Sequence, residues 1–429
     1  MTSALLTDRY EITMVEAALR AGTAHRESVF ELFARRLPEG RRYGVVAGTG
    51  RFLAELARFR FGDAELEWLR EGRIVDGPTL DWLADYRFSG TIRGYAEGEV
   101  YLPGSPLLVV ESTFAEGVLL ETLALSVFNY DSAVASAAAR MVSAADGRPL
   151  AEMGSRRTGE RSAVAAARAA YIAGFGATSN LEAGRTWGVP TMGTAAHAFT
   201  LLHDSEEDAF RAQVATLGPG TTLLVDTYDI EAAVRTAVEV AGTGLGAVRI
   251  DSGDLPSLVA QVRRQLDDLG ATGTRITVTN DLDEYTIAAL RAAPVDSYGV
   301  GTSVVSGSGH PAAGMVFKLV ARQDDDGRWV SVAKKSADKA TVGGRKSPVR
   351  TLTSGVAQQE VIRVDDAEPR EGERALLVDL VVDGVVDERW LGEAGTRRAR
   401  EHREAAVAEL PAGAFRLGRG EPVLPTVYE

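Results

Sequence analysis

His197 lies in the stretch GTAAHAFT (residues 193–200) and is one of only five histidines in the chain. Its neighbours Gly193 and Thr194, followed by two alanines, leave room beside the imidazole ring for a ligand. An accessible imidazole can transfer protons near neutral pH or act as a nucleophile, although a single histidine is often only structural. No second histidine or cysteine lies at zinc-ligand spacing, so a zinc site is not expected, and both interpretations of His197 stay open.

Charged side chains come directly after an apolar run in GAVRIDSGDL (residues 246–255). Arg249 could hold an anionic group of a substrate, and Asp251 could bind Mg²⁺ or the hydroxyls of a sugar. The alternative is a salt-bridged strand end at which Asp251 or Ser252 caps the next helix. The two roles can coexist in the same residues.

Glycines and a hydroxyl follow another apolar run in YGVGTS (residues 298–303). Gly299 and Gly301 would let backbone N–H groups approach an anion closely, and Thr302 adds a hydroxyl. Barrel enzymes commonly bind phosphate at their last strands in this way. An ordinary tight turn has the same composition, so this motif alone does not decide between the two.

Two further kinds of motif could complete an anion site. EMGSRRTGE (residues 152–160) places the paired Arg156 and Arg157 near a glycine, and a guanidinium suits phosphate or carboxylate, although exposed arginines are commonly only solvated. GATSN (176–180) and TNDLD (279–283) add small polar side chains that could orient a ligand. None of these motifs is specific by itself.

These motifs share one position in a repeating pattern of strands and helices. Between about residues 109 and 330, short apolar runs alternate with amphipathic helical stretches, as in TTLLVDTYD before IEAAVRTAVEVAG. This alternation is typical of a parallel sheet with helices on its faces. Because polar residues recur at the carboxyl end of each run, where barrel enzymes build their sites, we expect a barrel.

The rest of the chain is expected to form further domains beside this barrel. Residues 1–108 combine half-buried strands with a helix whose capping pattern begins at Asp8, and we expect an α+β domain. Residues 109–330 are the expected barrel domain. Residues 331–429 contain strands and a charged helix, and we expect them to pack on the amino-terminal domain.

A basic segment occupies residues 334–350, with the sequence KKSADKATVGGRKSPVR. It could clamp the phosphates of a substrate, or it could be a solvated loop. The sequence does not decide between these two interpretations.

Composition limits the class of protein. A chain of 429 residues with 45% hydrophobic and 25% charged residues is typical of a soluble globular protein of two or three domains. The net charge of −13 argues against nucleic-acid or membrane partners, and no run of uncharged apolar residues is long enough to span a bilayer. The amino terminus does not resemble a secretory signal, so we expect a cytoplasmic protein. Without cysteine, disulfides and thiolate chemistry are excluded.

Taken together and in order, the motifs resemble those of nicotinate phosphoribosyltransferases. The resemblance runs from about residue 5 to the carboxyl-terminal helix, in LLTDRYEITM, FELFARRLP, EMGSRR, GFGATSN, GTAAHAFT, LLVDTYD, VRIDSGDL, TNDLDE, DSYGVGTS and GGRKSPVR. It implies a type II phosphoribosyltransferase with an irregular or incomplete α/β barrel and an α+β amino-terminal domain completed by the carboxyl-terminal segment. Such enzymes join nicotinate to 5-phosphoribosyl 1-diphosphate in NAD salvage, with Mg²⁺ and with ATP as a co-substrate.

The resemblance also implies roles for individual residues. His197 matches the histidine that ATP transiently phosphorylates, and Asp251 matches a carboxylate near the ribose hydroxyls. Asp8 and Tyr10 match a segment that reaches the neighbouring subunit's site, which implies a homodimer with shared active sites. The other matched positions are Arg156 and Arg249 near the pyridine carboxylate and the diphosphate, Asn280, Gly299, Gly301 and Thr302 around the 5′-phosphate, and Met153, Ser179, Gly193 and Thr194 as further substrate-binding residues. The metal ligands are not assigned.

Two positions depart from patterns found in this group of enzymes. Met153 stands where an aromatic residue commonly stacks on the pyridine ring, and a thioether can still contact a ring. Ser179 stands where the nicotinamide-using relatives carry an aspartate. Because a neutral hydroxyl does not repel the carboxylate of nicotinate, we expect the acid rather than the amide as substrate.

Several alternatives remain at this point. One is a nicotinamide or quinolinate phosphoribosyltransferase. Another is a phosphosugar-processing barrel enzyme such as an aldolase, for which Lys318 would supply the lysine. A third is a non-catalytic nucleotide-binding protein derived from the enzyme, against which the intact His197, Arg249 and Asp251 argue.

Overall fold

The computed structural model describes residues 2–334, 342–364 and 367–429 and divides into two compact units. The split unit contains residues up to Ser136 together with His310–Glu429, and the half-barrel unit is the continuous segment Ala137–Gly309. The boundaries expected at residues 108 and 330 are therefore wrong. Helical residues after 108 pack in the core of the split unit, and the strand that begins at Met315 pairs with the amino-terminal part of the chain.

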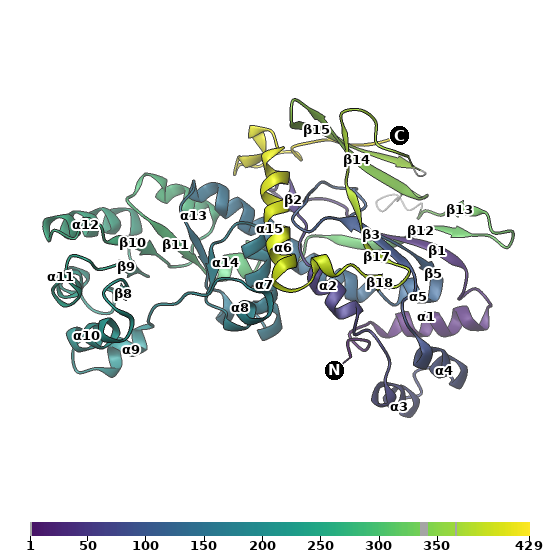
Figure 1. Cartoon of the computed structure of the whole chain (residues 1–429), viewed down its shortest axis with the longest axis horizontal. Helices are drawn as coiled ribbons and strands as arrows, with labels where there is room; N and C mark the ends of the chain where they lie inside the picture. The colour runs from purple at the N-terminus through teal and green to yellow at the C-terminus, as the bar shows by residue number, and fades with distance from the viewer. Residues whose placement is uncertain (1, 335–341, 365–366) are drawn as a thin grey trace. The chain divides into compact units, whose positions relative to one another are not determined.

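Six parallel strands form the sheet of the half-barrel unit, in the order β7-β6-β11-β10-β9-β8. Figure 1 labels β8, β9, β10 and β11 of this sheet. This is the order of a closed βα ring that has been opened between β7 and β8, so the expected incomplete barrel is confirmed. The strands are β6 (Leu150–Glu152), β7 (Ala177–Thr178), β8 (Thr222–Leu224), β9 (Ala247–Ile250), β10 (Arg275–Val278) and β11 (Ser297–Val300).

The helices of this unit follow the strands, and several are capped by side chains that the strand ends supply. Asn180 accepts a hydrogen bond from the backbone of Ala183, and Asp229 accepts one from Ala232. The helix after β9 begins beyond Asp254, so neither Asp251 nor Ser252 caps it, and the capping alternative for Asp251 is wrong. The helices are α7 (Glu160–Ile172), α8 (Leu181–Trp187), α9 (His197–Leu202), α10 (Glu206–Leu217), α11 (Ile230–Ala241), α12 (Leu255–Asp268), α13 (Glu284–Ala289) and α14 (Thr302–Val305).

The split unit is built on a seven-stranded sheet that takes strands from both of its chain segments. Its order is β13-β12-β1-β5-β3-β17-β18, and every pairing in it is antiparallel. Phe30 of β1 stacks on Phe317 of β12, with 5.2 Å between ring centroids, so residues far apart in the chain share one core. The strands are β1 (Glu27–Ala34), β3 (Thr91–Tyr95), β5 (Leu108–Thr113), β12 (Met315–Gln323), β13 (Trp329–Ser331), β17 (Leu377–Val382) and β18 (Val385–Val386).

A four-stranded sheet, a two-stranded sheet and further helices complete the split unit. The four-stranded sheet contains β16 (Glu373–Ala375), β14 (Lys346–Thr353), β15 (Val356–Val364) and β19 (Thr426–Tyr428), and the two-stranded sheet pairs β2 (Gly44–Val45) with β4 (Val100–Tyr101). The helices are α1 (Arg9–Arg20), α2 (Thr49–Leu56), α3 (Asp63–Glu71), α4 (Gly77–Asp85), α5 (Phe114–Val118) and α15 (Gly392–Ala408), while α6 (Glu121–Ala145) continues into the half-barrel unit.

Within the described residues, one helical stretch, 114–145, is long and apolar enough to cross a bilayer. Two thirds of its most apolar window is buried inside the fold, as in the core helix of a globular protein. It also carries the buried charged side chains of Asp131 and Arg140.

Three of the four described cations of the basic segment form ion pairs inside the split unit, and the fourth, Lys334, is exposed. Lys346 Nζ lies 2.6 Å from a carboxylate oxygen of Glu31, and both side chains are buried. Arg350 is fully buried between Glu99 and Glu360, and Arg345 pairs with Glu111. These three cations are therefore neither a phosphate clamp nor a solvated loop. Residues 335–341 of the segment lie outside the described residues.

Lys318 lies on β12 in the split unit, where its ammonium donates to the backbone oxygen of Phe317 and lies 3.9 Å from Glu121. It is not at a strand end of the half-barrel. The aldolase alternative therefore loses its lysine.

Glu11 is buried on α1, and its carboxylate accepts hydrogen bonds from Thr122 and Thr7. Burial raises the pKa of Glu11 from 4.5 to about 7. Because the folded pKa is raised, the stabilisation by this group is complete below pH 4.5 and is lost as the pH rises through about 7.

We expect Glu11→Gln to remove this pH dependence. Between about pH 5 and pH 8 the wild type should lose about 2 kcal/mol more of its free energy of unfolding than the variant. Urea denaturation at a series of pH values measures the difference, with the exposed Glu71→Gln as control. Equal slopes in the wild type and Glu11→Gln would contradict the assignment.

Candidate functional site

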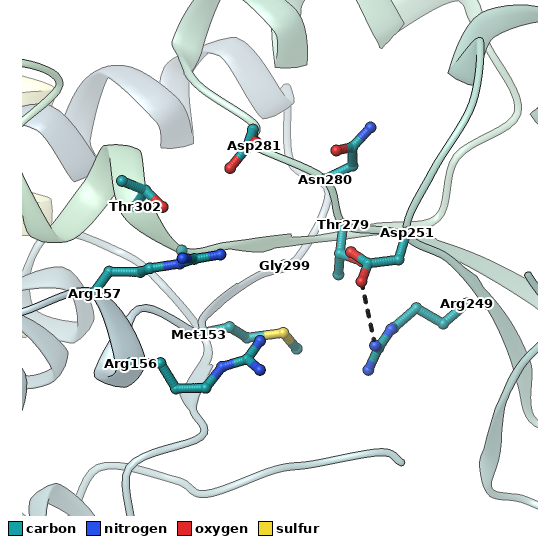
Figure 2. A pocket seen from close by; sticks show the side chains of 11 residues that line it. Met153, Arg156, Arg157, Arg249, Asp251, Thr279, Asn280, Asp281, Gly299 and Thr302 are labelled. Carbon is teal, nitrogen blue, oxygen red and sulfur yellow. Dashed lines mark hydrogen bonds and ion pairs between the residues drawn. The ribbon is translucent and has the colours of Figure 1, made fainter. Parts of the chain in front are cut away.

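A polar pocket of about 230 Å³ lies at the carboxyl ends of strands β6, β9, β10 and β11. Figure 2 shows three guanidinium groups and the carboxylate of Asp251 facing the same space. Its lining residues are Met153, Arg156, Arg157, Arg249, Asp251, Thr279, Asn280, Asp281, Gly299, Gly301 and Thr302. The pocket contains three arginines and two aspartates. It therefore suits an anionic ligand that also carries hydroxyl groups or a cation for the aspartates to bind.

Most of the residues expected at a site are brought together here. Eight of them line the pocket, namely Met153, Arg156, Arg249, Asp251, Asn280, Gly299, Gly301 and Thr302. Ser179, Gly193, Thr194 and His197 belong to the same unit but are not among its lining residues. Asp8 and Tyr10 lie at the start of α1 in the split unit, where Tyr10 is exposed.

Arg249 is the most enclosed of the pocket's charged groups. Its guanidinium lies 3.8 Å from Asp251 and donates to the hydroxyl of Thr194 and, at 3.2 Å, to the backbone oxygen of Ala195. Burial lowers its pKa, and within the described residues its Nε has no hydrogen-bond partner. A buried N–H without a partner costs free energy, which a bound anion would recover.

Glycines allow the loops around the pocket to approach one another closely. A Cβ atom at Gly299 would lie 2.7 Å from both the Met153 sulfur and the Thr279 methyl. At Gly154 it would lie 2.3 Å from Val305. Side chains at these positions would push the arginine loop away from β11, so the glycines set the width of the pocket.

Asn280 and Asp281 are in the left-handed region of backbone conformation, with φ of 103° and 42°. Two consecutive non-glycine residues in this region store strain that the surrounding structure must support. The turn holds both side chains over the pocket, as Figure 2 shows. Such strain is commonly found where a loop must contact a ligand.

His197 is the first residue of α9, in the chain segment that separates β7 from β8. Its side chain is 41% exposed, and Nε2 lies 3.1 Å from a carboxylate oxygen of Asp226, a side chain that is only 1% exposed. The other oxygen of Asp226 accepts from the backbone N–H of Asp251 at 2.8 Å and from the hydroxyl of Ser252 at 2.7 Å. A single buried carboxylate therefore joins His197 to the strand end that carries Asp251.

Asp226 was not among the residues expected at the site. Arg157, Thr279 and Asp281 were expected only as members of EMGSRRTGE and TNDLD, without roles of their own. The signal for Asp226 was present in LLVDTYD, where it lies two residues after the end of β8. The role of Asp226 depends on which strand pairs with β8, and the local sequence does not contain that information.

No group of three or more histidine, cysteine or acidic side chains that could hold a metal occurs in the described ranges. The pocket offers only Asp251 and Asp281. This matches Mg²⁺, which is commonly held by one or two carboxylates plus the phosphates of a substrate.

Comparison with known proteins identifies similar chains. Residues 5–129 match the nicotinate phosphoribosyltransferase (NAPRTase) N-terminal domain family. A nicotinate phosphoribosyltransferase of Mycobacterium tuberculosis is 56% identical over 433 residues, which cover 98% of this chain and 94% of that protein. Another from Bacillus subtilis is 36% identical over 359 residues, or 81% of this chain and 73% of that protein.

Two solved structures share the fold. Human nicotinic acid phosphoribosyltransferase has a TM-score of 0.83 at 24% identity, covering 99% of this chain and 97% of that chain. The nicotinate-nucleotide pyrophosphorylase from Pyrococcus furiosus has a TM-score of 0.78 at 21% identity, covering 95% of this chain and 96% of that chain. Both extend over nearly the whole of this chain.

The pocket should bind inorganic diphosphate through its arginines. We expect Arg249→Met to weaken binding by about tenfold, because a charge-assisted hydrogen bond contributes about 1.5–3 kcal/mol. Isothermal titration calorimetry at fixed ionic strength measures this. The exposed Arg235→Met on α11 removes the same charge outside the pocket and should leave affinity unchanged; an equal loss in both variants would reject the site.

Proposed function

The chain belongs to the nicotinate phosphoribosyltransferase family, and we propose that the pocket at the strand ends of its half-barrel binds 5-phosphoribosyl 1-diphosphate. The protein transfers the phosphoribosyl group to nicotinate and forms nicotinate mononucleotide and diphosphate, a step of NAD salvage. The observation that carries the assignment of the site is the group of three arginines beside Asp251. These groups match a substrate with phosphates at both ends of a sugar.

The chemistry requires charge stabilisation more than a strong base. The lone pair of the pyridine nitrogen forms the new bond to C1 of the ribose, and the electrons of the C1–O bond leave with diphosphate. The transition state resembles an oxocarbenium ion, as in glycoside cleavage. Arg249 would neutralise the departing charge in a partly enclosed site, where such contacts are strongest, and Arg156 would pair with the carboxylate of nicotinate.

We assign the other end of the substrate to β10 and β11. The backbone from Gly299 to Thr302 and the side chain of Asn280 would hold the 5′-phosphate. Asp251 would accept hydrogen bonds from the ribose hydroxyls, and the hydroxyl of Thr279 donates to its carboxylate and fixes its orientation. Mg²⁺, bound chiefly by the diphosphate and reached by Asp251 or Asp281, would supply further positive charge.

We further propose that His197 accepts a phosphoryl group from ATP. Asp226 holds Nε2, whereas Nδ1 has no hydrogen-bond partner within the described residues, so Nδ1 is the nitrogen free to attack. The new N–P bond replaces the bond to ADP, and water later releases phosphate. Asp226 also accepts the backbone N–H of Asp251, so one carboxylate links the histidine to the strand end that lines the proposed phosphoribosyl pocket.

A homodimer with shared active sites is part of the proposal. Leu201 and Leu202 on α9, next to His197, are 62% and 77% exposed, and Tyr10 is exposed on α1. A second copy that covers such residues would bury apolar surface. The proposal includes a cytoplasmic location. It includes no nucleic-acid or membrane partner, because the net charge of −13 would repel phosphate groups.

Substrate choice should depend on Ser179, which is exposed at the end of β7. We expect the wild type to use nicotinate in preference to nicotinamide and quinolinate. Ser179→Asp should raise KM for nicotinate by about tenfold or more, because its carboxylate repels that of the substrate. Steady-state kinetics with each pyridine measures this, and Ser179→Ala controls for loss of the hydroxyl. Faster use of nicotinamide by the wild type would overturn the assignment.

His197→Ala should separate ATP from synthesis. We expect it to lose labelling by ATP that carries a labelled γ-phosphate, and to keep slow turnover that ATP does not stimulate. Exposed His25 on the split unit provides the control, since His25→Ala should keep both the label and the stimulation. Unchanged ATP stimulation in His197→Ala would reject the phosphohistidine.

A further inference from the structure

Glu152 ends strand β6 directly before the loop that carries Met153, Arg156 and Arg157, and it is fully buried. One oxygen of its carboxylate accepts the backbone N–H of Gly154. The other accepts the hydroxyl of Thr178 at 2.6 Å. The side chain therefore binds its own loop on one side and the end of β7 on the other.

The hydrogen bonds continue into a closed ring between the two strand ends. The Thr178 hydroxyl that donates to Glu152 also accepts the N–H of Asn180 at 3.0 Å. The amide of Asn180 in turn donates to the hydroxyl of Ser155, also at 3.0 Å. The backbone oxygen of Glu152 accepts the N–H of Ser179 at 2.9 Å. Three of these hydrogen bonds join the arginine loop to the loop that carries Ser179: those from Thr178 to Glu152, from Asn180 to Ser155 and from Ser179 to Glu152. The other two hydrogen bonds lie within one loop.

Placing a carboxylate here has a cost. Burial raises the pKa of Glu152, and the hydrogen bonds from Thr178 and Gly154 act in the opposite direction. An apolar side chain at this position would leave the N–H and the hydroxyl without their acceptor. A fold that needed only to fill this space would not require a carboxylate.

We propose that Glu152 is a positioning residue that fixes the distance between the arginine loop and the Ser179 loop, and thereby sets the affinity for the pyridine substrate. The inference rests on the proposed function, in which these two loops hold nicotinate. Glu152 does not line the pocket, so it acts only through the residues that it holds. The 5′-phosphate groups on β10 and β11 lie outside the ring and should keep their geometry.

The test is a comparison of the two substrates in Glu152→Ala. We expect KM for nicotinate to rise by about tenfold or more, and KM for phosphoribosyl diphosphate to rise much less, because Glu152 does not hold Arg249 or the 5′-phosphate groups. Glu152→Gln should recover most of the loss, because its amide oxygen can accept the Gly154 N–H while its NH₂ group donates to Thr178. A purely structural role would lower the amount of active enzyme and leave both KM values unchanged.

Glu97→Gln is the matched control. Glu97 is also fully buried and accepts the N–H groups of two glycines, Gly48 and Gly50, but it lies in the split unit. The Glu97→Gln variant should have a changed thermal stability and an unchanged KM for nicotinate. If Glu152→Ala does not fold, Thr178→Val removes the hydrogen bond between Thr178 and Glu152 with little change of volume. This variant should raise KM for nicotinate more than KM for phosphoribosyl diphosphate.

Two results would overturn the inference. One is an unchanged KM for nicotinate in the folded variants, and the other is an equal rise of both KM values. Failure of the proposed function is distinguishable, because in that case the wild type itself would not convert nicotinate.

Discussion

In-register parallel pairing of four strands is the constraint on which the pocket depends. Glu152 pairs with Val300, Tyr298 with Val278, and Val278 with Ile250, so these strands end at one edge of the sheet. Residues that follow each strand by a few positions therefore face a common space, although they come from motifs far apart in the chain. A shift of one residue in any pair would turn alternate side chains to the other face and separate the arginines from Asp251.

Buried carboxylates perform the same physical task in both units. Glu97 accepts the N–H groups of the glycine-containing stretch at the start of α2, and Glu152 accepts one from the arginine loop. AGTGR at 47–51 and YGVGTS at 298–303 look alike as glycine-rich stretches after apolar runs. The first has its N–H groups bound to the protein's own carboxylate, whereas the second lines an open pocket. A glycine-rich stretch is thus a structural turn where a side chain from elsewhere in the protein accepts its N–H groups, and a candidate ligand site where the stretch lines a pocket.

The sequence predicted the pocket better than it predicted the partners of each residue. Alternation of apolar runs and helices located the strand ends, because that pattern is local and the parallel connection follows from it. The same pattern located the strand end that carries Asp226, but not its role, because that role comes from hydrogen bonds with Asp251 and His197 on other elements. The interpretation of the basic segment failed for a related reason. The local sequence does not show that Lys346 and Arg350 on β14 are buried beside Glu31 and Glu99. Domain boundaries also failed, because β12 pairs with a strand near the amino terminus.

The interrupted chain path of the split unit has a consequence for biosynthesis. The half-barrel is one continuous segment, so all of its strands are available once residue 309 has left the ribosome. Strands β1, β5 and β3 emerge much earlier, but the partners that cover their outer edges, β12 and β17, emerge last. During synthesis the nascent sheet therefore exposes two unpaired edges until β12 emerges, and one unpaired edge from then until β17 emerges. Unpaired strand edges are templates for pairing with another chain, so this interval is a stage at which strand-to-strand aggregation can compete with folding.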